Sequence, residues 1–194
     1  DFFQTSGQNL TAAEVDAGVR HHVALSVVGT DRLQESGYFR AKHAQESLIR
    51  TSPVPYTLIH ATQFFEFIRT IADISTDHAT VRLPPVQFQP MAAEDVAKAA
   101  ADTALAKPAN GTLEIGGPQI FTLDEAVRSV LEFDRDPRTV VADPAAPYYG
   151  VQVSERTLIP DDGARLGSTR LDWWLAHVPA PPKIVKAPVV ETAD

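Results

Sequence analysis

The sequence contains no cysteine among its 194 residues. This absence excludes a disulfide framework, a zinc finger and a thiol nucleophile. No apolar run approaches the roughly 18 residues that are needed to span a bilayer. The first residues, DFFQTS, have neither the basic start nor the apolar stretch of a signal peptide. We therefore expect a cytoplasmic protein without a membrane partner.

Positive charge is also scarce, with 17 Lys and Arg against 25 Asp and Glu, which gives a formal net charge of −8. Nucleic-acid binders draw much of their affinity from clustered Lys and Arg, and the sequence has no such cluster. A hydrophobic fraction of 44% and a charged fraction of 22% are instead typical of a folded globular domain. We expect a small molecule, and neither DNA nor RNA, as the partner.

Hydrophobic patterning predicts a chain in which helices and strands alternate. Continuous apolar runs, typical of strands buried on both faces, occur at 21–28 (HHVALSVV) and 56–61 (YTLIHA). Shorter strands are expected at 112–115 and 139–142. Helices are expected at 2–17, 37–51 with Ser36 as N-cap, 64–71, 92–106, and up to 133 from a capping box at Thr122 and Glu125. This order is typical of parallel βα units in an open α/β sheet.

A tyrosine and a lysine stand four residues apart in the helix predicted at 37–51. One helical turn separates Tyr38 from Lys42, so the phenol and the ammonium share a face, about 6 Å apart along the axis. A free phenol has a pKa of about 10, which a nearby cation lowers. Ser26 stands near the carboxyl end of the preceding strand, where open α/β sheets bind ligands. The pattern favours proton exchange between Tyr38 and a carbonyl or alcohol whose oxygen also binds Ser26.

Several longer segments carry a family resemblance. Ser26 lies in SGQNLTAAEVDAGVRHHVALSVVG, and Tyr38 and Lys42 lie in GYFRAKHAQESLIR. The second predicted strand lies in PYTLIHATQFF, and MAAEDVAKAAADTAL is followed by GTLEIGGPQIFTLDEAV. In this order the segments resemble the short-chain dehydrogenase/reductases, specifically the atypical, NmrA-like, NAD(P)-binding branch. The resemblance covers residues 1 to about 135 well and 136–178 loosely.

The resemblance implies that Tyr38 is the catalytic proton donor or acceptor and that Lys42 lowers its pKa and binds the nicotinamide ribose. Ser26 is implied to orient the substrate oxygen. The cofactor, NADP or NAD, is implied to lie against the residues that follow the second strand: Ala61, Thr62, Gln63 and Phe64. The chain departs from the family where Gln4 is the nearest equivalent of a helical Asn, and where Ala61-Thr62 replaces a frequent Pro-Gly.

A glycine-rich phosphate loop is missing. No G-x-G-x-x-G or G-x-x-G-x-x-G motif occurs in the sequence, although a dinucleotide-binding fold holds the pyrophosphate on such a turn. The resemblance therefore implies that the initial βαβ units, on the order of 80 residues, are absent. The chain is then either a fragment of a longer protein or a shortened protein that does not hold the cofactor in the usual way. NAD versus NADP stays open because the discriminating residue belongs to the absent segment.

The expected fold is the C-terminal part of a Rossmann-type doubly wound parallel sheet with a small α/β substrate-side lobe. Residues 1–62 are expected to form the distal half of the dinucleotide-binding domain. Residues 63–178 form the substrate-side lobe and the remaining sheet elements, and 179–194 a mobile proline-rich tail. The implied function is an NAD(P)H-dependent oxidoreductase acting on a carbonyl, alcohol or quinone-like small molecule. A non-catalytic dinucleotide-sensing regulatory protein, a truncated chain without cofactor binding, and a homodimer are left open.

The remaining histidines and tryptophans have plainer explanations. No metal site is expected, because the adjacent His21 and His22 point to opposite faces of a strand. We expect His43 at the surface and His60 at the edge of the core. Trp173 and Trp174 are expected to dock a C-terminal helix.

Overall fold

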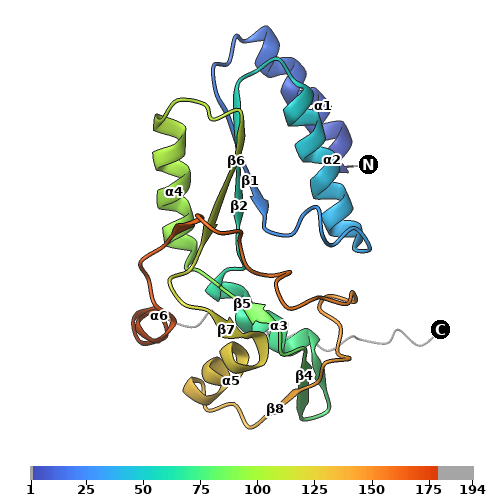
Figure 1. Cartoon of the computed structure of the whole chain (residues 1–194), viewed down its shortest axis with the longest axis vertical. Helices are drawn as coiled ribbons and strands as arrows, with labels where there is room; N and C mark the ends of the chain where they lie inside the picture. Colours follow the sequence, from blue (N-terminus) through green and yellow to red (C-terminus); the bar gives the residue numbers. More distant parts are fainter. Residues whose placement is uncertain (1, 179–194) are drawn as a thin grey trace, which may run out of the picture.

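The computed structural model describes residues 2–178. A four-stranded sheet in the order β1-β2-β6-β9 forms the upper part of the molecule in Figure 1. β1 (His22–Val27) pairs with β2 (Tyr56–Ala61), which pairs with β6 (Gly111–Gly116), and β6 pairs with β9 (Arg165–Leu166). All these pairings are parallel, so the predicted open α/β sheet is confirmed.

Helices cover both faces of this sheet. α1 (Phe2–Asp16) and α2 (Gly37–Thr51) lie side by side on one face, and α4 (Ala93–Leu105) lies on the other (Figure 1). All three confirm helices predicted from the sequence, and α2 has the predicted ends. β2 is buried on both faces, as its continuous apolar run predicts, whereas the same prediction is wrong for β1, an end strand of the sheet on which Leu25 is 44% exposed.

Successive residues of a strand face opposite sides of the sheet, so α2 and α4 meet different sets of side chains. Ile59 and Ala61 of β2 pack with Val96, Ala99 and neighbouring apolar residues beneath α4. His60, which lies between them, points to the α2 side. The predicted place of His60 at the edge of the core is confirmed, since its exposed fraction is 8%.

A smaller lobe lies below the sheet in Figure 1. Its β4 (Thr80–Leu83) pairs antiparallel with β3 (Thr76–Asp77) and parallel with β8 (Thr139–Ala142). A separate antiparallel pair joins β5 (Gln87–Phe88) and β7 (Phe121–Thr122). The helices of the lobe are η1 (Phe65–Phe67), α3 (Ile68–Ile74), α5 (Leu123–Phe133) and α6 (Leu171–His177).

The lobe has its own hydrophobic core, in which Phe65, Leu83 and Val127 are buried. The predicted capping box opens α5, where the Thr122 N–H donates to Glu125 Oε2 at 3.0 Å. Trp174 docks α6 into this core, whereas Trp173 is half exposed, so one of the two tryptophans fulfils the predicted role. The division of the chain after residue 62, into a dinucleotide-binding part and a substrate-side lobe, stays a prediction.

The lobe and the sheet meet at Gly117, where two backbones come close together. A Cβ at this position would lie 1.8 Å from the Pro90 carbonyl oxygen, so only glycine fits. The Gly117 N–H donates to Gln89 O at 3.2 Å, and Gln89 Nε2 donates to Gly117 O at 2.8 Å. These contacts hold the end of β6 against the segment between β5 and α4.

No helix within residues 2–178 is long and apolar enough to cross a membrane. The tail predicted at 179–194 lies outside the described residues.

Candidate active site

An apolar cavity of about 690 Å³ opens at the carboxyl ends of β1 and β2. Ligands of open α/β sheets bind at this edge, because the loops that follow the strands gather there. The cavity wall brings together every site residue predicted from the sequence: Ser26, Tyr38, Lys42, Ala61, Thr62, Gln63 and Phe64. The roles assigned to these residues stay predictions.

Tyr38 and Lys42 lie on the first turns of α2. Lys42 is buried, and its Nζ donates to Leu25 O at 3.0 Å and to Gln45 Oε1 at 2.6 Å. Burial lowers the pKa of Lys42, and the Glu46 carboxylate partly opposes this. Burial also raises the pKa of Tyr38. The predicted lowering of this pKa by Lys42 is therefore wrong for the ligand-free protein, because the ammonium binds a backbone carbonyl and an amide oxygen.

The hydroxyl of Ser26 is engaged on the side away from the apolar cavity. It donates to Glu46 Oε1 at 2.5 Å and lies 3.4 Å from Thr30 Oγ1. A serine hydroxyl has a single proton to donate. While Ser26 donates this proton to Glu46, a ligand in the apolar cavity therefore meets the Ser26 hydroxyl as a hydrogen-bond acceptor.

The loop after β2 carries polar groups that lack partners. Within residues 2–178, both side-chain atoms of the Gln63 amide and the hydroxyl of Thr62 are buried without a hydrogen bond. Leaving such a group unsatisfied costs about 1–3 kcal/mol. A primary carboxamide offers one acceptor and two donors, which complement those of Gln63. The loop therefore fits the carboxamide of a nicotinamide ring.

Aromatic side chains form much of the remaining wall. Phe64 and Phe67 stack with their ring centroids 5.6 Å apart. Tyr148 and Tyr149 enter from a two-residue turn of the smaller lobe that the sequence reasoning missed. In that turn the backbones of Tyr148 and Val151 exchange hydrogen bonds of 2.8 and 3.1 Å. The sequence YYG at 148–150 was the available signal, because tight hairpin turns favour glycine.

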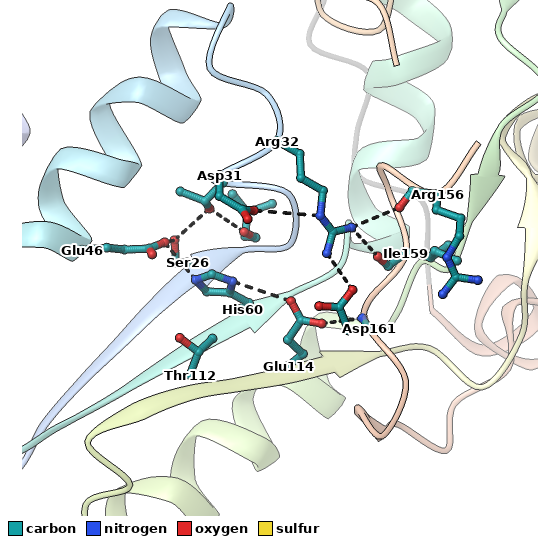
Figure 2. A network of polar contacts seen from close by, with 12 residues as sticks. Ser26, Asp31, Arg32, Glu46, His60, Thr112, Glu114, Arg156, Ile159 and Asp161 are labelled. Atoms are coloured by element: carbon teal, nitrogen blue, oxygen red, sulfur yellow. Dashed lines mark hydrogen bonds and ion pairs between the residues drawn. The ribbon is translucent and has the colours of Figure 1, made fainter. Parts of the chain in front are cut away.

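A second group of polar residues lies beneath α2. Ser26, His60 and Glu114 are register partners on three adjacent strands, so their side chains share the face that α2 covers. Glu46 of α2 reaches into this row. His60 Nε2 lies 3.0 Å from Glu46 Oε1, and His60 Nδ1 lies 3.8 Å from Glu114 Oε1 (Figure 2). We call Glu46, His60 and Glu114 the ion cluster.

Opposite charges dominate the electrostatics of the ion cluster. Burial favours the neutral form of each group, but hydrogen bonds from His60 and Ser26 and the charges of His60 and Arg50 lower the pKa of Glu46 to about 2. Burial likewise acts to lower the pKa of His60, but Glu114 and Glu46 raise it to about 9. Near neutral pH, an imidazolium therefore lies between two carboxylates.

A polar cavity of about 490 Å³ adjoins the ion cluster, and Glu46, His60 and Glu114 all line it. Arg32 closes one side of it, because its guanidinium donates to Asp161 Oδ1 at 2.9 Å (Figure 2). Sequence reasoning missed the ion cluster. Spacing offered a signal, since Glu46 follows Lys42 by one helical turn and lies on the same face of α2.

Comparisons with known proteins identify the type of fold. No protein-family model and no curated protein matches the chain. An NADPH-dependent quinone oxidoreductase from Escherichia coli superposes with a TM-score of 0.64 and 17% identity, over 88% of this chain and 72% of that one. The same oxidoreductase has been solved in complex with NADPH.

Two further solved structures show the same similarity. The triphenylmethane reductase from Citrobacter sp. has a TM-score of 0.53 and 20% identity, over 71% of this chain and 49% of that one. A UDP-Glc/GlcNAc 4-epimerase from Campylobacter jejuni has a TM-score of 0.62 and 12% identity, over 89% and 67%. The chain thus has a Rossmann-type fold like that of NAD(P)-binding reductases and epimerases, which confirms the predicted fold class and agrees with the family resemblance.

Proposed function

We propose that the protein is an NAD(P)H-dependent oxidoreductase of the short-chain dehydrogenase/reductase type that acts on a planar carbonyl or quinone-like small molecule. The observation that carries the proposal is the apolar cavity, which combines Tyr38, Lys42 and Ser26 with the unpartnered amide of Gln63. Solved structures of similar fold include two NADPH complexes, which supports a nicotinamide dinucleotide. The proposal covers NADP and NAD alike.

Two parts of the cavity wall would hold the nicotinamide end of the cofactor. Gln63 and Thr62 would bind the carboxamide, because their side-chain polar atoms have no other partner among the described residues. Lys42 has three ammonium protons, of which two already bind Leu25 O and Gln45 Oε1. Its third proton is available for a ribose hydroxyl. The bound nicotinamide supplies the hydride.

Tyr38 would supply the proton. Its raised pKa keeps the phenol protonated until a substrate oxygen gains negative charge. The Lys42 ammonium, one helical turn away, then stabilises the phenolate that remains. In the reverse direction Tyr38 takes the proton from the alcohol. General acid–base catalysis of this kind contributes roughly 10²–10⁴-fold to a rate.

The aromatic wall supports a planar substrate. Rings from α2, from the loop after β2 and from the 148–149 turn line the same cavity, and aromatic rings favour offset or edge-on packing with other rings. A quinone combines a planar ring with an oxygen that accepts a proton. The Escherichia coli structure of similar fold is itself a quinone oxidoreductase, which supports this substrate class.

The test uses the full-length protein. We expect calorimetry to show micromolar binding of NADPH or NADH, and we expect oxidation of the cofactor with quinones or aldehydes. Tyr38→Phe should lower kcat by roughly 10²–10⁴-fold without weakening cofactor binding. Tyr56→Phe, at the opposite end of β2 from the apolar cavity, is the matched control and should keep full turnover.

Each other outcome has a defined meaning. Cofactor binding without oxidation of any substrate supports the non-catalytic dinucleotide-sensing alternative. Full turnover by the Tyr38→Phe variant overturns the assignment of Tyr38. A protein that binds neither dinucleotide overturns the proposed function altogether.

A further inference from the structure

The apolar cavity holds more phenol groups than the proposed reaction uses. Tyr38 supplies the proton, and Tyr148 and Tyr149 line the same space from the smaller lobe. Tyr149 is half exposed, so its hydroxyl can bind water, whereas the exposed fraction of Tyr148 is only 4%. Buried tyrosine hydroxyls usually have a hydrogen-bond partner. Within residues 2–178 the Tyr148 hydroxyl has none, so we looked for its partner in a ligand.

We propose that the Tyr148 hydroxyl donates a hydrogen bond to the substrate and thereby selects molecules with a second acceptor oxygen, which favours quinones over simple aldehydes and ketones. Tyr38 binds one oxygen of the substrate, and Tyr148 binds the other. The inference rests on the proposed function and deepens it, because it narrows the class of substrate that the apolar cavity takes.

The turn that carries Tyr148 holds the phenol in place. The Tyr148 N–H donates to Val151 O at 2.8 Å, and the Val151 N–H donates to Tyr148 O at 3.1 Å. Both residues belong to the core of the smaller lobe, and the Tyr148 ring packs edge-on against Tyr149. A donor that is fixed before the ligand arrives loses little conformational freedom on binding.

The Tyr148 phenol acts as a donor that keeps its own proton. Burial raises the pKa of Tyr148 well above its ordinary value, and the charges of Tyr149 and Tyr38 raise it further. The effect of Tyr38 places the two phenols within electrostatic reach of each other. Among residues 2–178 no hydrogen bond joins them. A ligand can therefore bind both hydroxyls without breaking a contact between them.

Ser26 does not provide this second donor. The family resemblance implies that Ser26 orients the substrate oxygen, but its single proton is donated to Glu46 Oε1 at 2.5 Å. The proposed function already assigns Lys42 and Gln63 to the cofactor. Tyr148 therefore supplies the hydrogen bond that Ser26 cannot give.

Two separate donors in an apolar cavity complement a ring with two oxygens. A quinone carries two carbonyl oxygens on one planar ring, and negative charge that develops during reduction is shared between them. A hydrogen bond from Tyr148 to the second oxygen strengthens as this charge develops. An aldehyde of similar size has one oxygen, which Tyr38 protonates, and it leaves the Tyr148 hydroxyl buried without a partner. Such a loss disfavours the aldehyde complex.

The test measures the binding of two bicyclic compounds, 1,4-naphthoquinone and 1-naphthaldehyde, to the full-length protein and its Tyr148→Phe variant. Calorimetry is carried out with oxidised cofactor in excess, because this form has no hydride to transfer. We expect Tyr148→Phe to raise the Kd of naphthoquinone roughly tenfold and to leave the Kd of naphthaldehyde within about twofold. With reduced cofactor, kcat/KM for naphthoquinone should fall by at least the same factor. The chain has no cysteine thiol that could add to the quinone.

Stability separates this role from a structural one. Because the Tyr148 hydroxyl has no partner to lose, the Tyr148→Phe variant should resist urea at least as well as the wild type. Tyr56→Phe, at the opposite end of β2 from the apolar cavity, is the matched control. It should change neither Kd.

The outcomes separate this inference from the proposed function. A Tyr148→Phe variant with the wild-type Kd for naphthoquinone overturns the inference. So does an equal loss of affinity for both compounds, or a wild type that binds neither. A selective loss of naphthoquinone binding supports the role of Tyr148. If the same protein oxidises no cofactor, the proposed function is overturned, and the cavity binds quinones without reducing them.

Discussion

At the scale of the single residue, Tyr149 has a strained backbone conformation at the wall of the apolar cavity. Its φ is 48°, in the left-handed region, which non-glycine residues other than Asn and Asp rarely adopt. Gly150 follows with φ of 81°, as a two-residue hairpin turn requires. Such strain costs on the order of 1–3 kcal/mol and tends to occur at functional sites. The ring also packs edge-on against Tyr148, with centroids 4.8 Å apart.

We predict that Tyr149→Asn weakens substrate binding while leaving stability almost unchanged. Asparagine tolerates the left-handed region, and this gain offsets the lost ring contact with Tyr148, which is worth about 1 kcal/mol. Urea denaturation should therefore give a free energy of unfolding within about 1 kcal/mol of the wild type. The KM for a planar quinone should rise roughly tenfold, as expected when a contact worth about 1.4 kcal/mol is lost.

Tyr149→Phe keeps the ring and serves as the control for this prediction, so its KM should match that of the wild type. An unchanged KM in the Tyr149→Asn variant would show that the substrate does not contact this turn.

At the scale of secondary-structure elements, α5 depends on its first turn. The capping box joins the Thr122 N–H to the Glu125 carboxylate, and the Thr122 hydroxyl donates to Asp124 Oδ1 at 2.7 Å. Behind this turn, α5 buries its apolar face in the core of the smaller lobe. We predict that Thr122→Ala lowers the free energy of unfolding by about 1 kcal/mol, the usual cost of losing an N-cap.

Chemical denaturation checks this prediction, with Ser129→Ala as the control. Ser129 lies on the exposed side of α5, where its hydroxyl donates to Glu125 O at 2.9 Å. Alanine is the better helix former, so this variant should be as stable as the wild type or slightly more stable. Equal losses in both variants would contradict a specific role of the cap.

Spacing within one helix was easier to read from the sequence than contacts between elements. Tyr38 and Lys42 share a face by helix geometry alone, so their proximity needed no tertiary information. The alignment of Ser26, His60 and Glu114 depends on the register of three strands, and the sequence separates these residues by long intervals. Register is set by how the whole sheet packs. For this reason β1, β2 and α2 were predicted, whereas the ion cluster was not.

In the smaller lobe, too, pairing between distant strands could not be predicted from the sequence. The sequence predicted one short helix at 64–71, where the structure has η1 and α3, and no strand was predicted for the residues that form β3 and β4. β4 is stabilised by parallel pairing with β8, which lies far along the chain. Pairing of this kind overrides local composition, because strand formation depends on neighbours more than on intrinsic preference.

At the scale of the whole molecule, the ion cluster makes stability depend on pH in both directions. The pKa of Glu46 is lowered from 4.5 to about 2, so its contribution is present above pH 4.5 and is lost as pH falls toward 2. The pKa of His60 is raised from 6.5 to about 9, so its contribution is present below pH 6.5 and is lost as pH rises through 9.

We therefore predict a maximum of unfolding free energy near pH 5–6. The loss between pH 6 and pH 10 should reach about 3 kcal/mol, counted once for the pair, because one pKa unit corresponds to about 1.4 kcal/mol. Denaturation of the wild type and of Glu46→Gln/His60→Gln across this range isolates the effect from other charges. If the unfolding free energies of the two proteins change with pH in parallel, the predicted contribution of Glu46 and His60 is contradicted.

The register of β2 also limits which insertions and deletions the chain tolerates. His60 lies between Ile59 and Ala61, which pack under α4. Deleting one residue upstream within β2 turns His60 into that apolar layer and turns its neighbours toward the carboxylates, because the side-chain period of a strand is two. A change in the length of β2 would thus damage the apolar core and the ion cluster at the same time, whereas a point substitution affects only one of them. In related chains we expect β2 to vary in residue type but to keep its length.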